Sequence, residues 1–182
     1  DSDAAFRLAF SGGWTYSTNG AQPNGTNGYA DTKLVPSTSL SQNDTHISYY
    51  SRTNNVVDSY DIGTSQAVYQ YLLALSMKID ATTSANFVND LTPYQLTTAD
   101  SLGLQIISRQ ISTEIKVNKN ALTRQTITKN SISPLSSSSI YIGALNLGGT
   151  ASRFANRQAA FATIGNGLTD AEAALLYSII QQ

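Results

Sequence analysis

A segment near residue 50 alternates apolar and polar side chains with a period of two, the pattern of a half-buried β-strand. Ile47 and Tyr49 fall on one face, whereas His46, Tyr50 and Arg52 fall on the other. Similar short runs recur along the chain between Gly, Asn, Asp and Pro residues that favour turns. The expected strands cover residues 5–10, 29–35, 45–52, 56–62, 67–79, 102–108, 112–117, 122–128, 140–145 and 158–164.

Two polar segments, residues 11–27 and 36–44, read as loops rather than strands. Residues 68–75 are ambiguous between strand and helix by periodicity alone, and their neighbours favour strand. Short strands at a spacing of roughly 8–12 residues are typical of an all-β sandwich or barrel. A chain of 182 residues without an internal repeat fits one domain, residues 1–182.

A helix is expected only at the C-terminal end. Thr169 and Glu172 have the spacing of a capping box, in which each side chain accepts a hydrogen bond from the other residue's amide. Residues 171–180 are then apolar nearly all round, which is typical of a helix buried on more than one side. We expect the helix to be wedged between the sandwich and its loops; the alternative is contact with another chain.

Composition excludes several classes of partner. Charged residues make up 13% of the chain and the formal net charge is −1. Nucleic acid and anionic membranes both require a basic surface, so neither is an expected partner. Ser, Thr, Asn and Gln together supply 68 of the 182 residues, a composition typical of secreted and virion-surface domains.

No apolar run approaches the roughly 18 residues that span a bilayer, so membrane insertion is not expected. No signal-peptide pattern opens the chain, which begins with Asp1 and ends within the expected helix. We therefore expect it to be a piece of a longer protein.

Catalytic groups are scarce. Glycoside hydrolysis needs two neighbouring carboxyl groups, but the chain has two glutamates, Glu114 without an acidic residue two positions away and Glu172 in the expected helix cap. A single histidine, His46, and the absence of a G-x-S-x-G motif argue against a Ser-His-Asp triad. The chain is therefore expected not to be an enzyme.

No cofactor is expected. One histidine and no cysteine exclude the usual zinc sites. Calcium prefers several oxygen ligands, and Asp31, Asp58 and Asp61 are the carboxylates that could contribute. They are better explained as turn residues, so calcium has no clear site.

Residue types suited to sugar binding are more numerous than catalytic groups. Sugars stack on aromatic faces, and the chain has ten tyrosines and one tryptophan. Trp14, in a Gly-rich segment, is either an exposed platform or a plug over one end of the sandwich. If Ile47 and Tyr49 face the core, then His46, Tyr50 and Arg52 face outward; an ordinary solvated surface is the alternative.

The C-terminal segment resembles a known family. IYIGALN (residues 140–146), AAFATIG (159–165) and GLTDAEAALLY (167–177) are similar to the closing segment of concanavalin A-like lectin/glucanase domains. The likeness is particularly to the laminin-G-like subset found in bacteriophage tail, fibre and capsid-associated proteins. Residues 24–32 (NGTNGYADT), 46–52 and 109–120 also resemble parts of that family.

The resemblance implies a jelly-roll sandwich of two antiparallel sheets with one C-terminal helix. It also implies a non-enzymatic domain on a virion surface, which adheres to host-surface polysaccharide or cements the particle by contact with other virion proteins. A homo-oligomer would then be expected, a trimer in a fibre. One departure is that Ala159 and Ala160 stand where many relatives carry Asp-Glu. The alternatives are a carbohydrate-binding module of a secreted bacterial protein and a glycan hydrolase.

Overall fold

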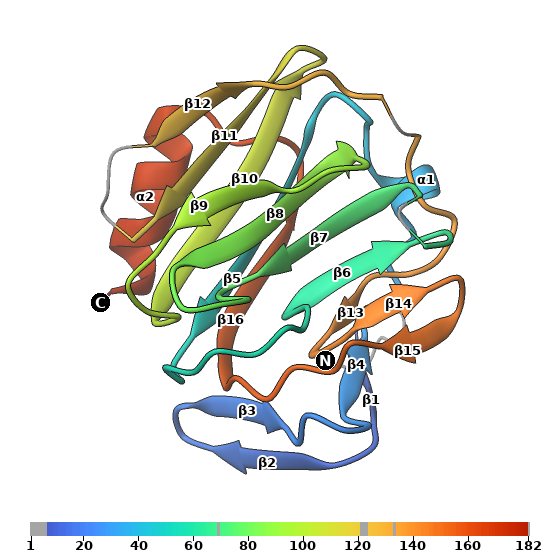
Figure 1. Cartoon of the computed structure of the whole chain (residues 1–182), viewed down its shortest axis with the longest axis vertical. Coiled ribbons are helices and arrows are strands. Elements are labelled where there is room, and N and C mark those ends of the chain that lie inside the picture. Colours follow the sequence, from blue (N-terminus) through green and yellow to red (C-terminus); the bar gives the residue numbers. More distant parts are fainter. Residues whose placement is uncertain (1–6, 69, 121–123, 133, 182) are drawn as a thin grey trace.

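The computed structural model describes residues 7–68, 70–120, 124–132 and 134–181, which fold into two packed β-sheets (Figure 1). The predicted β-sandwich with a C-terminal helix is thereby confirmed. The nine-stranded sheet runs in the order β1-β4-β13-β6-β7-β8-β9, with β14 beside β6 and β15 beside β14. Its strands are β1 (Ala9–Ser11), β4 (Tyr29–Asp31), β6 (Ile62–Ser65), β7 (Leu72–Ser76), β8 (Thr83–Asp90), β9 (Tyr94–Thr97), β13 (Tyr141–Ile142), β14 (Leu145–Leu147) and β15 (Thr150–Ser152).

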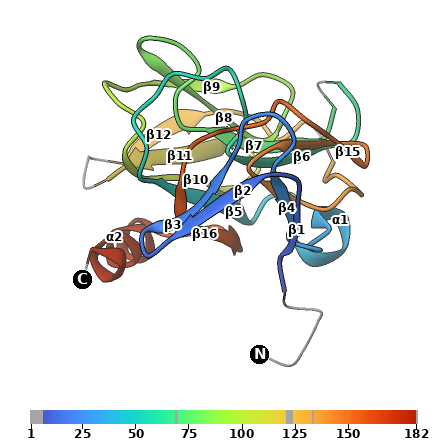
Figure 2. The same cartoon turned by 90° about the horizontal axis from the view of Figure 1, so that it is seen from below.

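The seven-stranded sheet runs in the order β12-β11-β10-β5-β16-β3-β2. All its pairings are antiparallel, whereas the other sheet has one parallel pairing, between β14 and β6. Its strands are β2 (Trp14–Ser17), β3 (Gly20–Pro23), β5 (Thr45–Ser51), β10 (Gly103–Ile111), β11 (Glu114–Lys119), β12 (Gln125–Thr128) and β16 (Ala159–Gly165). Figure 2 shows the two sheets stacked, with helix α2 (Asp170–Ile180) on the outer side of the seven-stranded one.

The main core lies between the sheets. Alternation along β5 places Ile47 and Tyr49 in it, fully buried, as the period-two pattern predicts. Alternation along β7 sends Leu73 to the same core and Leu72 to the outer face of the nine-stranded sheet. That outer face carries a second, smaller buried cluster that includes Phe87, so the nine-stranded sheet is apolar on both faces.

Several strands differ from the predicted pattern. The polar segment 11–27 was expected to be a loop, but it contains the β2–β3 hairpin, which closes at Ser17 and Gly20. Its residues are mostly polar because both strands lie at the sheet's edge, where few side chains reach a core. Residues 56–61 form no strand, and β8 and β9 arise in a region without an expected strand.

Other boundaries also shift. A one-turn helix, α1 (Pro36–Ser39), replaces part of the expected loop 36–44, with proline at its first position. The ambiguous run 68–75 overlaps the strand β7, which supports strand over helix for its second half. Of the expected first strand, residues 5 and 6 lie outside the described residues, as do 122 and 123 of the expected strand 122–128.

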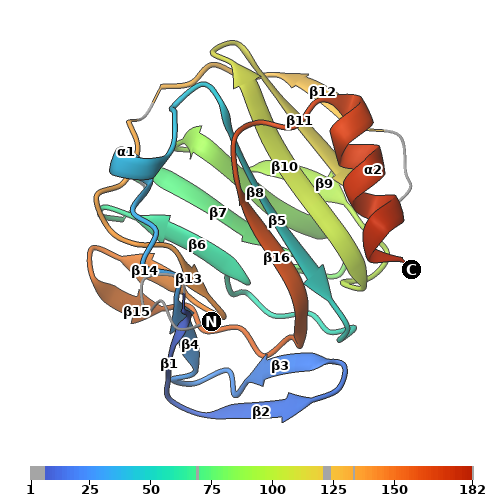
Figure 3. The same ribbon diagram turned by 180° about the vertical axis from the view of Figure 1, so that it is seen from behind.

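Helix α2 begins with the predicted capping box. The Thr169 hydroxyl accepts from the Glu172 amide at 3.2 Å, and the Glu172 carboxylate accepts from the Thr169 amide at 2.8 Å. The helix lies across the outer face of the seven-stranded sheet (Figure 3), where Ala173 packs with Leu104 and Ile106.

The expectation that α2 is buried on more than one side is wrong. Leu175 and Ile179 are 58% and 56% exposed, and within the described part of the helix only Ala173 is fully buried. A single stripe meets the sheet, and none of the loops that the structure describes covers the opposite side. The alternative expectation, contact with another chain, stays a prediction.

Candidate functional site

His46 is buried, although the sequence places it on an outward sheet face. Its Nδ1–H donates to the carbonyl of Asn166, and its Nε2 lies 3.0 Å from the hydroxyl of Thr163. The β16–α2 connection covers the ring, so outward orientation from the core does not give solvent access. Burial, and secondarily the charge of Arg124, lower the pKa of His46 below 6.5. The imidazole therefore serves as a neutral structural group that fixes this connection.

Tyr50 lies on the outer face of β5, and Arg52, directly after the strand, lies on the same side, as the alternation predicts. The Arg52 guanidinium carbon lies 5.5 Å from the centroid of the Tyr50 ring. Tyr50 packs against the cluster under α2, and Gln181 lies 3.4 Å from its hydroxyl. Arg52 is exposed, whereas the Tyr50 ring is half-buried. This part of the face therefore offers an exposed cation over a half-buried tyrosine ring.

Trp14 lies in an aromatic cluster formed by β1 and β2. Phe10 meets its ring edge-on, with centroids 5.0 Å apart, and Tyr16 lies nearly parallel at 6.5 Å. The indole N–H donates to the carbonyls of Ser11 and Tyr29, which fixes the orientation of the ring. Phe10 and Tyr16 are 45% and 62% exposed. The cluster therefore presents aromatic surface to solvent, and Trp14 itself is half-buried.

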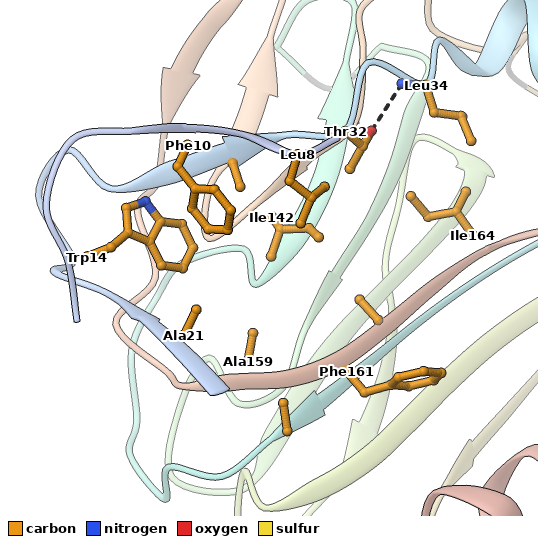
Figure 4. Close-up of a pocket in the computed structure, with 13 residues that line it drawn as sticks. Leu8, Phe10, Trp14, Ala21, Thr32, Leu34, Ile142, Ala159, Phe161 and Ile164 are labelled. Carbon is orange, nitrogen blue, oxygen red and sulfur yellow. Dashed lines mark hydrogen bonds between the residues drawn. The ribbon is translucent and has the colours of Figure 1, made fainter. Parts of the chain in front are cut away.

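This cluster stands beside a cleft of about 420 Å³. The cleft opens between the β1–β4 edge of one sheet and the β16–β3 edge of the other (Figure 4). Phe10 and Trp14 lie at one end of it, and Leu34 and Ile164 at the other. It exists because β16 pairs with β5 along its length but meets β3 only at Ala159.

A compact loop holds the aromatic end of the cleft in place. Asn24 accepts hydrogen bonds at 3.0 Å from the amides of Thr26, Asn27 and Gly28, so one side chain orders the turn. Asn27 in turn accepts from the Gly13 amide at 3.0 Å, immediately before Trp14. A side chain at position 28 would overlap the carbonyl of Gly13, which explains the glycine there. The indole is thus positioned before any ligand arrives.

The interior of the cleft is poor in polar groups. Thr32 is its one hydroxyl-bearing side chain, and that group already donates to the Ile140 carbonyl at 2.8 Å and accepts from Leu34. A ligand would therefore gain contact area and ring stacking from the interior, and would find polar partners only at the mouth. The volume is within the range of small-molecule sites.

A second concave region, here called the Tyr60 groove, lies on the outer face of the nine-stranded sheet. It has a volume of about 160 Å³ and is lined by Tyr60, Ser65, Val68, Leu72, Leu145, Leu147, Ser152 and Arg153. At its rim, Arg153 pairs with Asp58. The sequence did not point to this groove, because Tyr60 and Arg153 are 93 positions apart and neither lies in a recognisable motif.

The carboxylates considered as calcium ligands do not form a cluster. Asp31 pairs with Lys33, Asp58 with Arg153, and Asp61 with Arg157. Among the residues that the structure describes, no three His, Cys, Asp or Glu side chains are close enough to hold a metal ion. Within the same residues no helix has the length and apolar character to span a membrane.

No family model matches the sequence, and the comparison with curated proteins gave no relative. Solved structures do resemble the fold. The CBM40 carbohydrate-binding module of the Ruminococcus gnavus IT-sialidase, bound to α2,3-sialyllactose, superposes with a TM-score of 0.54 at 15% identity, over 74% of this chain and 81% of that one. The same module bound to α2,6-sialyllactose gives a TM-score of 0.53 at 13% identity, with coverage of 74% and 82%.

Two larger proteins contain a similar sandwich. The leech intramolecular trans-sialidase matches with a TM-score of 0.52 at 12% identity, over 75% of this chain but 23% of its own. A mutant of HCR/D, a clostridial toxin domain, gives 0.55 at 11% identity, over 96% of this chain and 46% of that one. At these identities the likeness shows a shared β-sandwich fold.

Proposed function

We propose that this domain is a non-enzymatic carbohydrate-binding module whose ligand stacks on Phe10, Trp14 and Tyr16. The observation that carries the proposal is the meeting of three aromatic rings, of which Phe10 and Trp14 line the cleft and Phe10 and Tyr16 are exposed. Aromatic side chains provide large contact area with little loss of rotamer freedom, and they suit the C–H faces of pyranose rings. Crystal structures of a similar fold contain sialyllactose, which supports a glycan ligand.

The resemblance of residues 139–182 to phage structural domains adds a location to the proposal. We place the domain on the outer surface of a virion, where it would bind a host cell-surface polysaccharide. The exposed apolar residues Leu175 and Ile179 favour a second role, contact with another virion protein or another copy of the chain. Light scattering of the isolated domain tests the self-association part of that role, and a strictly monomeric particle would contradict it.

Trp14 is the only tryptophan, so its fluorescence reports directly on the proposed site. Titration with 3′-sialyllactose, 6′-sialyllactose and lactose should quench or shift its emission if a sugar stacks there. Tyr16→Ala should weaken binding by roughly fivefold, since a lost aromatic contact is worth about 1 kcal/mol. Tyr16 is 62% exposed, so this variant should fold normally.

Arg52→Ala is the matched control. It removes the exposed cation from the alternative sugar-binding surface, the outer face of the seven-stranded sheet at Tyr50. Retained binding in Arg52→Ala together with lost binding in Tyr16→Ala supports the cleft. The reverse result would move the site to Tyr50 and Arg52. A glycan array without any bound sugar, and an unchanged Trp14 emission at millimolar ligand, would refute carbohydrate binding by this domain.

A further inference from the structure

The Tyr60 groove faces away from the aromatic cleft. Its floor includes Leu72, whose neighbour Leu73 points into the core between the sheets. The cleft borders that core, because Ile142 and Ile164 line the cleft and also pack against the core residues. The two concave regions therefore lie on opposite faces of the nine-stranded sheet, and a ligand in one does not contact the other.

The backbone of Arg153 adopts a conformation that favours glycine. Its φ is +47°, and a residue with a Cβ is strained there. Flanking contacts enforce the conformation: Ser152 pairs with Leu145, Phe154 bridges to Tyr60, and the Arg153 carbonyl accepts from the Tyr60 amide at 3.1 Å. Strain of this kind concentrates at functional sites. An arginine in this strained conformation therefore indicates a functional role for its side chain.

The Arg153 side chain is held over the groove by two contacts. Its Nη1 donates to both carboxylate oxygens of Asp58 at 2.9 Å, and its guanidinium carbon lies 6.0 Å from the centroid of the Tyr60 ring. Both hydrogen bonds use Nη1, so among the described residues Nη2 and Nε have no hydrogen-bond partner. The side chain of Asp58 is 74% exposed. Free donors and free acceptor positions thus stand side by side at the rim.

We propose that the Tyr60 groove binds a neutral pyranose. An anionic ligand would compete with Asp58 for the guanidinium and would be repelled by that carboxylate, whereas a cation would be repelled by Arg153. A sugar hydroxyl both donates and accepts, so adjacent hydroxyls can donate to Asp58 and accept from Arg153 without breaking the pair. The C–H face of the ring then lies on the apolar floor that Leu145 and Leu147 provide.

This proposal adds a second sugar-binding site to the proposed function and names its class of ligand. It can be wrong while the proposal for the aromatic cleft is right. ¹H–¹⁵N NMR of the whole chain, titrated with lactose and cellobiose, should shift the amide signals of residues 58–60 and 152–154. Asp58→Asn should weaken the affinity about tenfold or more, since it removes a charged acceptor. Arg153→Gly should do the same while its Tm stays equal or rises, because glycine adopts the left-handed conformation freely.

Two controls separate this groove from the aromatic cleft. Tyr16→Ala should leave the groove's response to lactose unchanged, and Arg153→Gly should leave the Trp14 fluorescence titration unchanged. Free N-acetylneuraminic acid should not shift the groove signals. The assignment is overturned if neither neutral sugar shifts residues 58–60 and 152–154 at millimolar concentration, or if the acidic sugar shifts them more strongly than lactose.

Discussion

Replacement of Arg157 by methionine should destabilise the domain by several kcal/mol, because it leaves a carboxylate buried without its cation. Arg157 and Asp61 are both fully buried, with Nη1 2.7 Å from Oδ2. The same carboxylate oxygen accepts from the Met77 amide at 2.7 Å. The other guanidinium nitrogen, Nη2, donates to the carbonyls of Asn55, Val57 and Lys78. One side chain therefore ties the 55–61 segment to the end of β7.

The magnitude follows from burial. Two unit charges about 4 Å apart attract by about 4 kcal/mol at an effective dielectric constant of 20, but by about 1 kcal/mol in water. Removal of one partner of a buried pair typically costs about 3–5 kcal/mol, and the carbonyls left without a donor add to the loss. We expect about 4 kcal/mol for Arg157→Met near neutral pH.

The same chain offers a matched control. Arg153 and Asp58 are also paired at 2.9 Å, but their side chains are 45% and 74% exposed. Arg153→Met should therefore cost less than about 1 kcal/mol. Guanidinium chloride unfolding followed by far-UV circular dichroism measures both values, with equal m-values as the check on two-state behaviour.

The pH dependence of the variant gives a second readout. Burial raises the pKa of Asp61 above 3.8, and Arg157 opposes that rise. Without Arg157 the folded state should hold the carboxyl proton to higher pH than the unfolded chain does. Its stability therefore falls as pH rises through the window above 3.8, and the deficit of Arg157→Met should shrink in acid. Equal costs for Arg157→Met and Arg153→Met would refute the reasoning that burial sets the value of these pairs.

Three further changes test other parts of the structure. Because the pKa of His46 lies below 6.5 when folded, the unfolded chain takes up that proton first and stability falls as pH drops below about 6.5; His46→Gln should flatten this part of a thermal-unfolding series. Thr169→Ala should cost about 1 kcal/mol through loss of the helix cap, and hydrogen exchange should quicken in the first turn of α2. Leu175→Gln, on the exposed side of α2, should change the free energy of unfolding by less than about 0.5 kcal/mol, and a large loss would show that this side is buried.

Local sequence patterns correctly predicted the features that depend on interactions between residues close in the chain. The period-two alternation placed Ile47 and Tyr49 in the core, and the spacing of Thr169 and Glu172 fixed the start of α2. Each of these features depends on residues close in sequence, so its physical cause can be read from the sequence. The β2–β3 hairpin was missed for the same reason, because an edge hairpin with polar side chains carries no apolar alternation.

The sites depended on tertiary structure. Trp14 could be named from residue type, but its partners Phe10 and Tyr16 became a platform only when β1 and β2 met at the open edge of the sandwich. His46 faces outward from the core, yet β16 and the β16–α2 connection bury it from 117–120 positions away.

The sequence alone was enough to predict the fold class and the capped terminal helix, because period and capping act over a few residues. Only the folded chain decided which polar groups are buried, where the cleft opens, and that Arg153 stands over Tyr60. Those features arise where segments distant in sequence pack together, and long-range packing leaves no periodic trace in a single chain.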